Sequence, residues 1–210
     1  MRAELVWRLE DGQRWPAWVW RLTAGHLVAS SASVGGGVGE RAWVLNAQVP
    51  RDYGRTDLAA HGGELAGALA LAGPGVALLT AADVTRARAA RDGGVRAHVT
   101  AGVDLPTWAA APDGPGAPAA GTINIVVLVR ARLAPGALVN LLTTATEAKA
   151  QAQALFEAGI PGTGTPSDAV AVVTSPRGDE EAFGGPRSAV GARVARAVHR
   201  ALSEALVVAP

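Results

Sequence analysis

The stretch GTINIVVLVRARLAPGALVNLLTTATEAKAQA, residues 121–152, is predicted to form a strand followed by a helix. Residues 121–129 are almost continuously apolar, which favours a strand. From Leu138 to Phe156 apolar residues recur at helical spacing and form one stripe. The loop GTGTPSD (162–168) and a second apolar strand, AVAVV (169–173), complete this central unit.

Lys149 lies in the predicted helix and is the only lysine among 19 Lys and Arg residues. Arginine stays protonated at any working pH, whereas a buried lysine amine can lose its proton and act as base or nucleophile. At about 100° per residue, Lys149 falls inside the apolar stripe, Thr146 lies beside it, and Glu147 turns toward solvent. The pattern allows two interpretations: a reactive residue, or a lysine whose aliphatic stem packs in the core while its ammonium group stays solvated.

The part of the chain before this unit is predicted to be β-rich. Residues 4–10 alternate between apolar and polar side chains, as a half-buried strand does. Turn signals at glycines separate the further strand candidates, which are residues 17–22, 26–30 and 41–49.

Two polar segments in this region are open to two interpretations each. The glycine-rich segment 30–40 precedes a strand and lacks the phosphate-binding fingerprints, which favours a flexible hairpin loop over a ligand-contacting loop. The segment 46–54, which contains the only tyrosine, is interpreted as a turn with Asx hydrogen bonds in preference to a ligand contact.

The remaining elements alternate between helix and strand, with His98 interpreted as a structural histidine. We predict helices at 57–71, 81–91 and 187–207, strands at 76–79 and 95–103, and a Pro-, Gly- and Ala-rich surface loop at 110–120. The sequence therefore predicts an α/β or α+β fold, in which a β-rich N-terminal part joins a mixed β-sheet and helices pack on the sheet. A length of 210 residues suits a single domain over 1–210.

Composition excludes several classes of function. A net charge of +1 with interspersed signs gives no footprint for nucleic acid. The chain has no cysteine, and its four histidines show no metal-ligand spacing, so no protein-bound metal or cofactor is expected. Charged residues interrupt the N-terminus where a signal peptide needs an apolar core, so export is not indicated. Residues 73–75, Gly-Pro-Gly, break the longest uncharged run, which argues against a membrane-spanning helix. We therefore expect a cytoplasmic protein with no membrane contact.

The central unit resembles the adenosylcobinamide amidohydrolase family of corrinoid salvage. The resemblance lies in GTINIVVLV (121–129), LAPGALVN (133–140), TEAKAQA (146–152) and TGTPSDAVAVV (163–173), with weaker agreement in SSASVGGG, NAQVP, LLTAADV and VTAGV. The family pattern has Thr where this chain has Ser167, and both carry a hydroxyl group. The resemblance implies hydrolysis of the amide that joins a corrinoid ring side chain to its aminopropanol arm, giving adenosylcobyric acid for cobalamin assembly. The cobalt then belongs to the substrate.

Amide hydrolysis requires a nucleophile, a proton donor for the departing amine and stabilisation of the oxyanion. The nucleophile can be a Thr or Ser hydroxyl activated by Lys149, or a water activated by Asp168 or Glu147. A third option is Thr122, exposed by self-cleavage after Gly121, with its own amine as base. Asp168 is expected to orient Lys149 or hold a water, unless it only caps the loop; if the two pair closely, Lys149 is an electrostatic clamp.

The predicted site combines these catalytic candidates with a polar lining. The predicted catalytic residues are Lys149, Thr146, Asp168 and Glu147, and the predicted substrate-binding residues are Asn124, Thr122, Gly162, Thr163, Gly164, Thr165 and Asn46. The alternative function is a non-catalytic corrinoid-binding protein in which Trp43 or Trp108 packs against the macrocycle.

Overall fold

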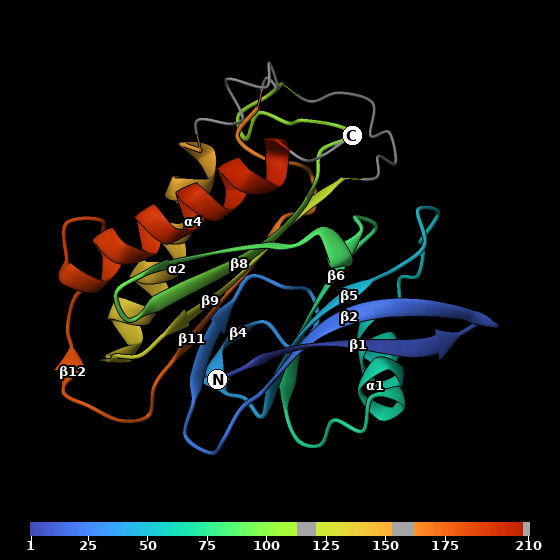
Figure 1. Ribbon diagram of the computed structural model, residues 1–210, viewed down its shortest axis with the longest axis horizontal. Helices are drawn as coiled ribbons and strands as arrows, with labels where there is room; N and C mark the ends of the chain where they lie inside the picture. The colour runs from blue at the N-terminus through green and yellow to red at the C-terminus, as the bar shows by residue number, and fades with distance from the viewer. Residues whose placement is uncertain (113–120, 153–161, 208–210) are drawn as a thin grey trace.

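The computed structural model of the protein describes residues 1–112, 121–152 and 162–207, and within them two β-sheets lie face to face (Figure 1). At the centre of the larger sheet, β9 (Thr122–Val129) and β11 (Ala169–Thr174) run parallel. Parallel neighbours need a crossover connection, and α2 (Pro135–Ala150) lies between them in the sequence. The apolar central unit thus supplies the middle of the fold.

Antiparallel strands extend this sheet on both sides, in the order β4-β3-β11-β9-β8-β7. The flanking strands are β3 (Leu27–Ser30), β4 (Gly37–Glu40), β7 (Arg88–Asp92) and β8 (Val95–Gly102). All eight residues of β9 are buried, because both faces of the sheet are covered.

The second sheet has the order β1-β2-β5-β6. Its strands are β1 (Ala3–Glu10), β2 (Gln13–Arg21), β5 (Trp43–Gln48) and β6 (Gly75–Thr80). Asp11 and Gly12 both have positive φ, 49° and 75°, which is the two-residue turn that suits the twist of a β-hairpin. The parallel pair β5 and β6 is connected through α1 (Leu58–Ala68).

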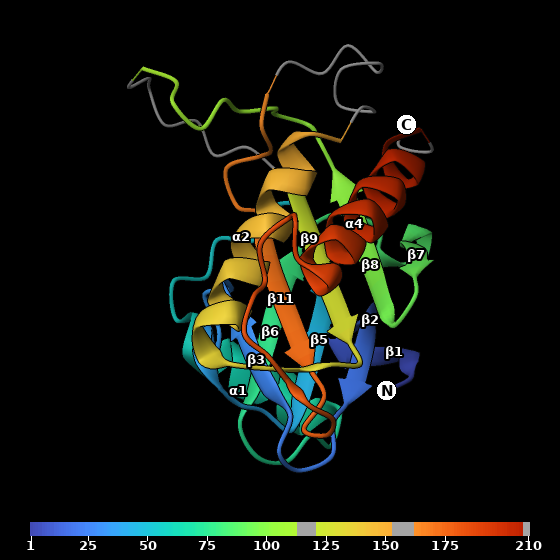
Figure 2. The same cartoon turned by 90° about the vertical axis from the view of Figure 1, so that its left-hand side faces the viewer.

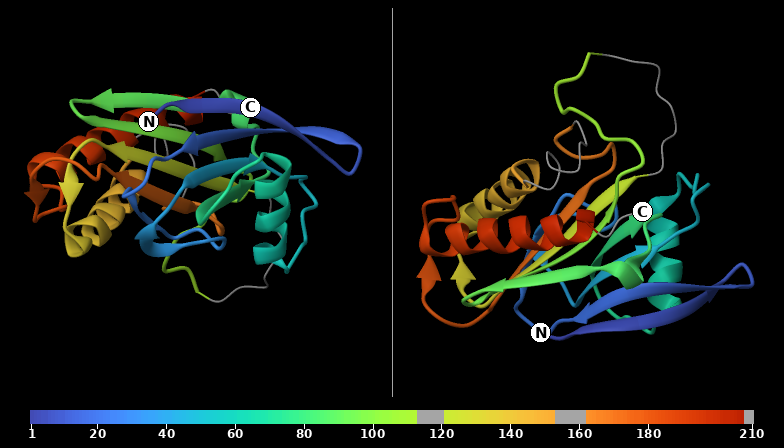
Figure 3. Two further views of the ribbon diagram at one scale, coloured as in Figure 1. Left: turned by 90° about the horizontal axis from the view of Figure 1, so that it is seen from below. Right: turned by 45° about the horizontal axis from the view of Figure 1, so that its top comes forward.

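Three apolar layers hold these elements together. Ile123, Ile125 and Val127 of β9 face α2 and α4 (Ala189–Val207), which lie across β8, β9 and β11 (Figure 2). Val126 and Leu128 point the other way, into the layer between the two sheets. The third layer lies under α1, on the side of the molecule opposite to α2 and α4 (Figure 3). A short parallel pair, β10 (Arg132–Leu133) with β12 (Glu180–Glu181), lies at the periphery.

The structure confirms the α/β prediction but contradicts two local predictions. The predicted helix at 81–91 is wrong: a single 3₁₀ turn, η1 (Val84–Arg86), leads into β7. Pairing of β7 with β8 overrides the helix propensity of its Ala and Arg residues. The glycine-rich segment 30–40 is not entirely a loop, because Gly37–Glu40 forms β4 against β3.

Two predictions extend beyond the described residues. The surface loop at 110–120 overlaps 113–120, and the apolar stripe of the helix at Leu155 and Phe156 falls within 153–161; both ranges lie outside the described part of the chain. Among the described helices, none has the length and apolar character needed to cross a membrane.

His98 is expected to make the fold sensitive to acid. The side chain is 6% exposed, lies edge-on to Trp20 at 5.2 Å, and its Nε2 atom has no hydrogen-bond partner among the described residues. Burial, followed by the charges of Arg96 and Arg91, lowers the pKa of His98 to about 4. As the pH falls below about 6.5, His98 binds a proton in the unfolded chain but not yet in the folded protein. The contribution of neutral, buried His98 to the free energy of unfolding is therefore complete above about pH 6.5 and is lost progressively as the pH falls to about 4.

The expected loss is about 3 kcal/mol between pH 7 and pH 4. Urea unfolding of the wild-type protein and of His98→Gln at both pH values measures it. The variant is expected to lose that much less stability on acidification, and equal losses in the two proteins would contradict the prediction.

Candidate active site

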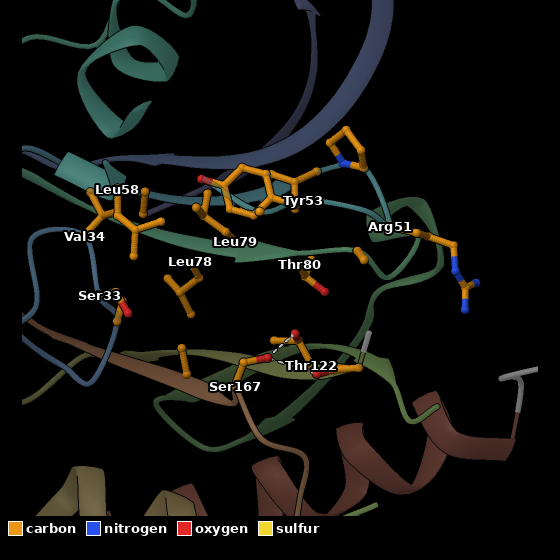
Figure 4. Close-up of a pocket in the computed structure, with 18 of the residues that line it drawn as sticks. Ser33, Val34, Arg51, Tyr53, Leu58, Leu78, Leu79, Thr80, Thr122 and Ser167 are labelled. Atoms are coloured by element: carbon orange, nitrogen blue, oxygen red, sulfur yellow. Dashed lines mark hydrogen bonds between the residues drawn. The ribbon is translucent and has the colours of Figure 1, made fainter. Parts of the chain in front are cut away.

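A cavity of about 680 Å³ lies at the edge of the layer between the two sheets (Figure 4). Thr122 and Ser167 lie on one wall, while Tyr53 and Leu79 lie on the opposite wall. Loop residues 49–54 and 32–34 complete the walls. A cavity of this size with a few converging hydroxyl groups is typical of a small-molecule site.

The hydroxyl groups of Thr122 and Ser167 are linked to each other and to a backbone carbonyl. Thr122 Oγ1 and Ser167 Oγ are 2.8 Å apart, and Ser167 Oγ donates to the Gly121 carbonyl at 3.0 Å. Because a carbonyl can only accept, the Ser167 proton points to Gly121, and the Thr122 hydroxyl donates to Ser167. The side chain of Thr122 therefore stands at the cavity wall with a defined hydrogen-bond direction.

Lys149 and Asp168 form a buried ion pair beneath this wall, with each side chain 10% exposed. Asp168 also accepts hydrogen bonds from the backbone N–H of Ile123, at 2.8 Å, and of Thr165, at 3.0 Å. Neither Lys149 nor Asp168 lines the cavity. The pair joins α2, the first residues of β9 and the loop that precedes β11, so it positions Thr122 from behind.

The other two predicted catalytic residues lie elsewhere on α2. Thr146 is exposed, and its hydroxyl donates to the carbonyl of Leu142 at 3.0 Å. Glu147 is also exposed, as its direction on the helix predicts. The structure brings together Lys149, Asp168 and Thr122, and it leaves Thr146 and Glu147 on the solvent side of the helix.

The predicted binding residues Asn46 and Asn124 form a buried bridge between the sheets. Asn124 Nδ2 donates to Asn46 Oδ1 at 2.9 Å and to the carbonyl of Leu79 at 3.1 Å. Asn46 Nδ2 in turn donates to Thr100 Oγ1 at 3.1 Å. Neither asparagine lines the cavity, so the bridge fixes the distance between the sheets that bound it.

The predicted loop 162–165 packs against Thr107. The N–H of Thr107 donates to the Gly164 carbonyl at 2.9 Å, and the N–H of Thr163 donates back to the Thr107 carbonyl at 3.0 Å. Thr165 Oγ1 lies 2.9 Å from the Gly121 carbonyl and also bonds Asp168. Through Thr165 the loop reaches the Gly121 carbonyl that Ser167 also contacts.

Gly164→Ala is expected to destabilise the protein by about 1–3 kcal/mol. A Cβ atom at this position would lie 2.2 Å from Asp168 Oδ2 and 2.3 Å from Lys149 Nζ, so the ion pair would have to move. Gly63→Ala is the matched control, because a Cβ there meets nothing within 4 Å and alanine suits the middle of α1. Urea unfolding measures both, and a Gly164→Ala protein as stable as wild type would contradict the prediction.

Tyr53 lines the cavity at the end of a buried chain of polar groups. Its hydroxyl lies 2.7 Å from His61 Nδ1, and His61 Nε2 lies 2.8 Å from Glu10 Oε1. Burial raises the pKa of Tyr53, so the phenol stays protonated at neutral pH. Arg8 completes the chain by donating to Glu10 Oε2 at 3.0 Å. The network ties the β1–β2 hairpin to α1 and holds the Tyr53 ring in the wall.

The sequence did not single out several residues that line the cavity. Ser167 entered only as a family variation, Ser33 lay in the predicted hairpin loop 30–40, and residues 49–54 lay in the predicted turn 46–54, with a ligand contact as the less favoured interpretation of both segments. Their signal was a cluster of polar residues directly after or before a predicted strand. Trp43, a candidate for contact with a macrocycle, is 5% exposed and bonds the Gly73 carbonyl, so it packs in the core, whereas Trp108 is 48% exposed.

Among the described residues, no group of three or more His, Asp or Glu side chains has the arrangement of a metal site. A second hollow of about 650 Å³ shares Val49, Arg51, Ala81 and Gly121 with the first, so the two concavities are neighbours.

Comparison with known proteins agrees with the resemblance in the central unit. The sequence profile of the adenosylcobinamide amidohydrolase family matches residues 2–209. A protein of Halobacterium salinarum named adenosylcobinamide amidohydrolase is 39% identical over 135 residues, which cover 61% of this chain and 57% of that protein. A protein of the same name from Methanosarcina mazei is 32% identical over 167 residues, covering 80% of this chain and 77% of the relative. With a profile that matches nearly from end to end, the chain belongs to the adenosylcobinamide amidohydrolase family.

Proposed function

We propose that the protein hydrolyses the amide between the corrinoid ring side chain and the aminopropanol arm of adenosylcobinamide-type corrinoids. The products are the free aminopropanol and a cobyric acid form that can re-enter cobalamin assembly. Family membership supports the substrate class. The observation that carries the chemistry is the linked Thr122 and Ser167 hydroxyl pair on the wall of the cavity.

In this proposal Thr122 supplies the nucleophile. A threonine hydroxyl that attacks an amide carbonyl splits the hydrolysis into two steps through an acyl intermediate. Lys149 acts as an electrostatic clamp: its amine bonds Asp168, and Asp168 holds the N–H of Ile123, the neighbour of Thr122. Tyr53 and Leu79 give the opposite wall an apolar surface for the arm and the adjoining edge of the ring.

We also propose that cobalt enters with the substrate and that the protein binds no cofactor of its own. Protein treated with a chelator and then dialysed is expected to keep its full activity. Recovery of lost activity by an added divalent cation would contradict this part of the proposal.

The direct test incubates the protein with adenosylcobinamide and follows release of aminopropanol and formation of the corrinoid acid by chromatography and mass spectrometry. Stoichiometric release of both products, over many turnovers, is expected. Tight corrinoid binding without release would instead support a non-catalytic corrinoid-binding protein.

A further inference from the structure

The peptide bond between Gly121 and Thr122 lies in a setting that differs from an ordinary strand start. Its carbonyl oxygen accepts a hydrogen bond from Ser167 Oγ at 3.0 Å and lies 2.9 Å from Thr165 Oγ1. Both residues belong to the loop that precedes β11, and neither is a backbone partner in the sheet. The single proton of the Thr165 hydroxyl goes to the Asp168 carboxylate, so Ser167 is the hydroxyl that donates to this carbonyl. A hydroxyl that donates to a carbonyl polarises it and stabilises negative charge on its oxygen.

The neighbouring nucleophile is the side chain of Thr122 itself, which is 5% exposed. Because Ser167 donates to the Gly121 carbonyl, the Thr122 hydroxyl donates to Ser167, and the three groups form one directed chain from nucleophile to carbonyl. This order of donors and acceptors is the one that carries a proton from the attacking hydroxyl to the carbonyl oxygen.

We infer that the chain cleaves its own Gly121–Thr122 peptide bond. Thr122 Oγ1 attacks the Gly121 carbonyl carbon, its proton passes to Ser167, and the Ser167 proton passes to the carbonyl oxygen. The five-membered ring intermediate then transfers that proton to the Thr122 nitrogen as the C–N bond breaks, leaving an ester between Gly121 and Thr122 Oγ1. One water hydrolyses the ester to a Gly121 carboxylate and a free Thr122 hydroxyl.

Attack by the side chain on its own preceding carbonyl is intramolecular, which removes the entropy of bringing the reactants together. Asp168 restricts the strand start further, because it holds the N–H of Ile123 at 2.8 Å. Gly121 is also closely packed against the backbone of a neighbouring segment. A Cβ atom at this position would lie 3.2 Å from the Gly102 carbonyl oxygen and 3.3 Å from the Asp104 nitrogen.

The fold can retain both products of the cut. β9 stays paired with β8 from the first fragment, through eight residue pairs from Thr122 to Val129, and with β11 from the second. β3, from the first fragment, pairs with β11 from the second. The two fragments therefore share one sheet and remain associated under native conditions.

Cleavage also supplies the base that an intact Thr122 lacks, a consequence that rests on the proposed amidase function. The new α-amine of Thr122 lies on the same residue as the hydroxyl and can take its proton during attack on a substrate amide. The ordering is then self-cleavage first and corrinoid hydrolysis second.

Intact-mass spectrometry of the freshly purified full-length protein tests the inference. Two fragments are expected, residues 1–121 and 122–210, whose masses sum to the intact chain plus one water, and N-terminal sequencing of the second is expected to begin at Thr122. A folded wild-type preparation that remains one chain would overturn the inference, whether or not it releases aminopropanol. Cleavage without release would leave the inference standing and overturn the amidase proposal.

Matched variants separate the chemistry from proteolysis by another enzyme. Thr122→Val is expected to stay intact, Thr122→Ser to be cleaved, and the exposed helix variant Thr143→Ala to be cleaved like wild type. Ser167→Ala is expected to slow cleavage about 10²-fold, since it removes the proton carrier, and Ser167→Thr to restore it. Hydroxylamine is expected to trap the ester as a hydroxamate on Gly121. Cleavage of Thr122→Val at the wild-type rate would overturn the mechanism.

Discussion

Thr122→Val is expected to reduce aminopropanol release from adenosylcobinamide by about 10⁴-fold or more, the size of effect seen when a nucleophile is removed. Valine keeps the volume of threonine and removes the hydroxyl that bonds Ser167. The measurement is the steady-state rate of release, with corrinoid binding followed separately by the change in its visible spectrum. Binding is expected to change little, because the walls of the cavity remain.

Two comparisons make this result specific. Thr122→Ser keeps a hydroxyl and is expected to keep measurable activity, and Thr143→Val, on the exposed side of α2, is expected to match wild type. If Thr122→Val folds as wild type and still releases aminopropanol at more than a tenth of the wild-type rate, Thr122 is not the nucleophile.

Lys149→Ala is expected to lower the free energy of unfolding by about 3–5 kcal/mol, because it leaves the buried carboxylate of Asp168 without its cation. Lys149 is 8% exposed, so the carboxylate of Asp168 has little contact with bulk water to compensate for the lost ammonium group. Urea unfolding at neutral pH measures the loss. Activity is expected to fall with it, since Asp168 and Thr165 then no longer hold the start of β9 in place.

The double variant Lys149→Met, Asp168→Asn is the control for charge. Asparagine keeps one acceptor for the N–H of Ile123, and no uncompensated charge stays buried, so the double variant is expected to be more stable than Lys149→Met alone. A Lys149→Ala protein as stable as wild type would contradict the role of the pair. If that protein also kept full amidase activity, Lys149 would have no role in catalysis.

The predicted elements that proved correct are those with strong periodicity. The apolar run at 121–129 became β9, buried on both faces, and the helix predicted at 187–207 became α4, whose buried side includes Val190, Val194, Val198 and Leu202. In both elements the side chains that are buried recur at the spacing of the element, so the order of apolar residues in the sequence predicts it.

The helix prediction for 81–91 is wrong because its Ala and Arg residues suit a helix locally, whereas in the folded protein this segment pairs with the edge of β8. That edge exists only in the assembled sheet.

The features of the site also fall into those that the sequence predicts and those that depend on the tertiary structure. The lone lysine, its place inside the apolar stripe of a helix, and the motif before β11 are properties of the sequence, and they led to Lys149 and Asp168, whereas Thr122 entered as the possible product of self-cleavage after Gly121 and as a binding residue. That Lys149 bonds Asp168 behind the wall, while Thr122 and Ser167 face the cavity, depends on residues 19 and 45 positions apart in the sequence meeting at the ends of the central strands β9 and β11.

The sequence by itself determined the strand–helix–strand unit through its apolar periodicity, and it determined the family and the candidate site residues through its motifs, because both are carried by the chain alone. The tertiary structure alone decided which of those residues face the cavity, since strand pairing and side-chain direction at the ends of β9 and β11 separate the two faces of the sheet. It also placed the hydroxyl group of Ser167 on the carbonyl of Gly121, a long-range arrangement that no local pattern encodes.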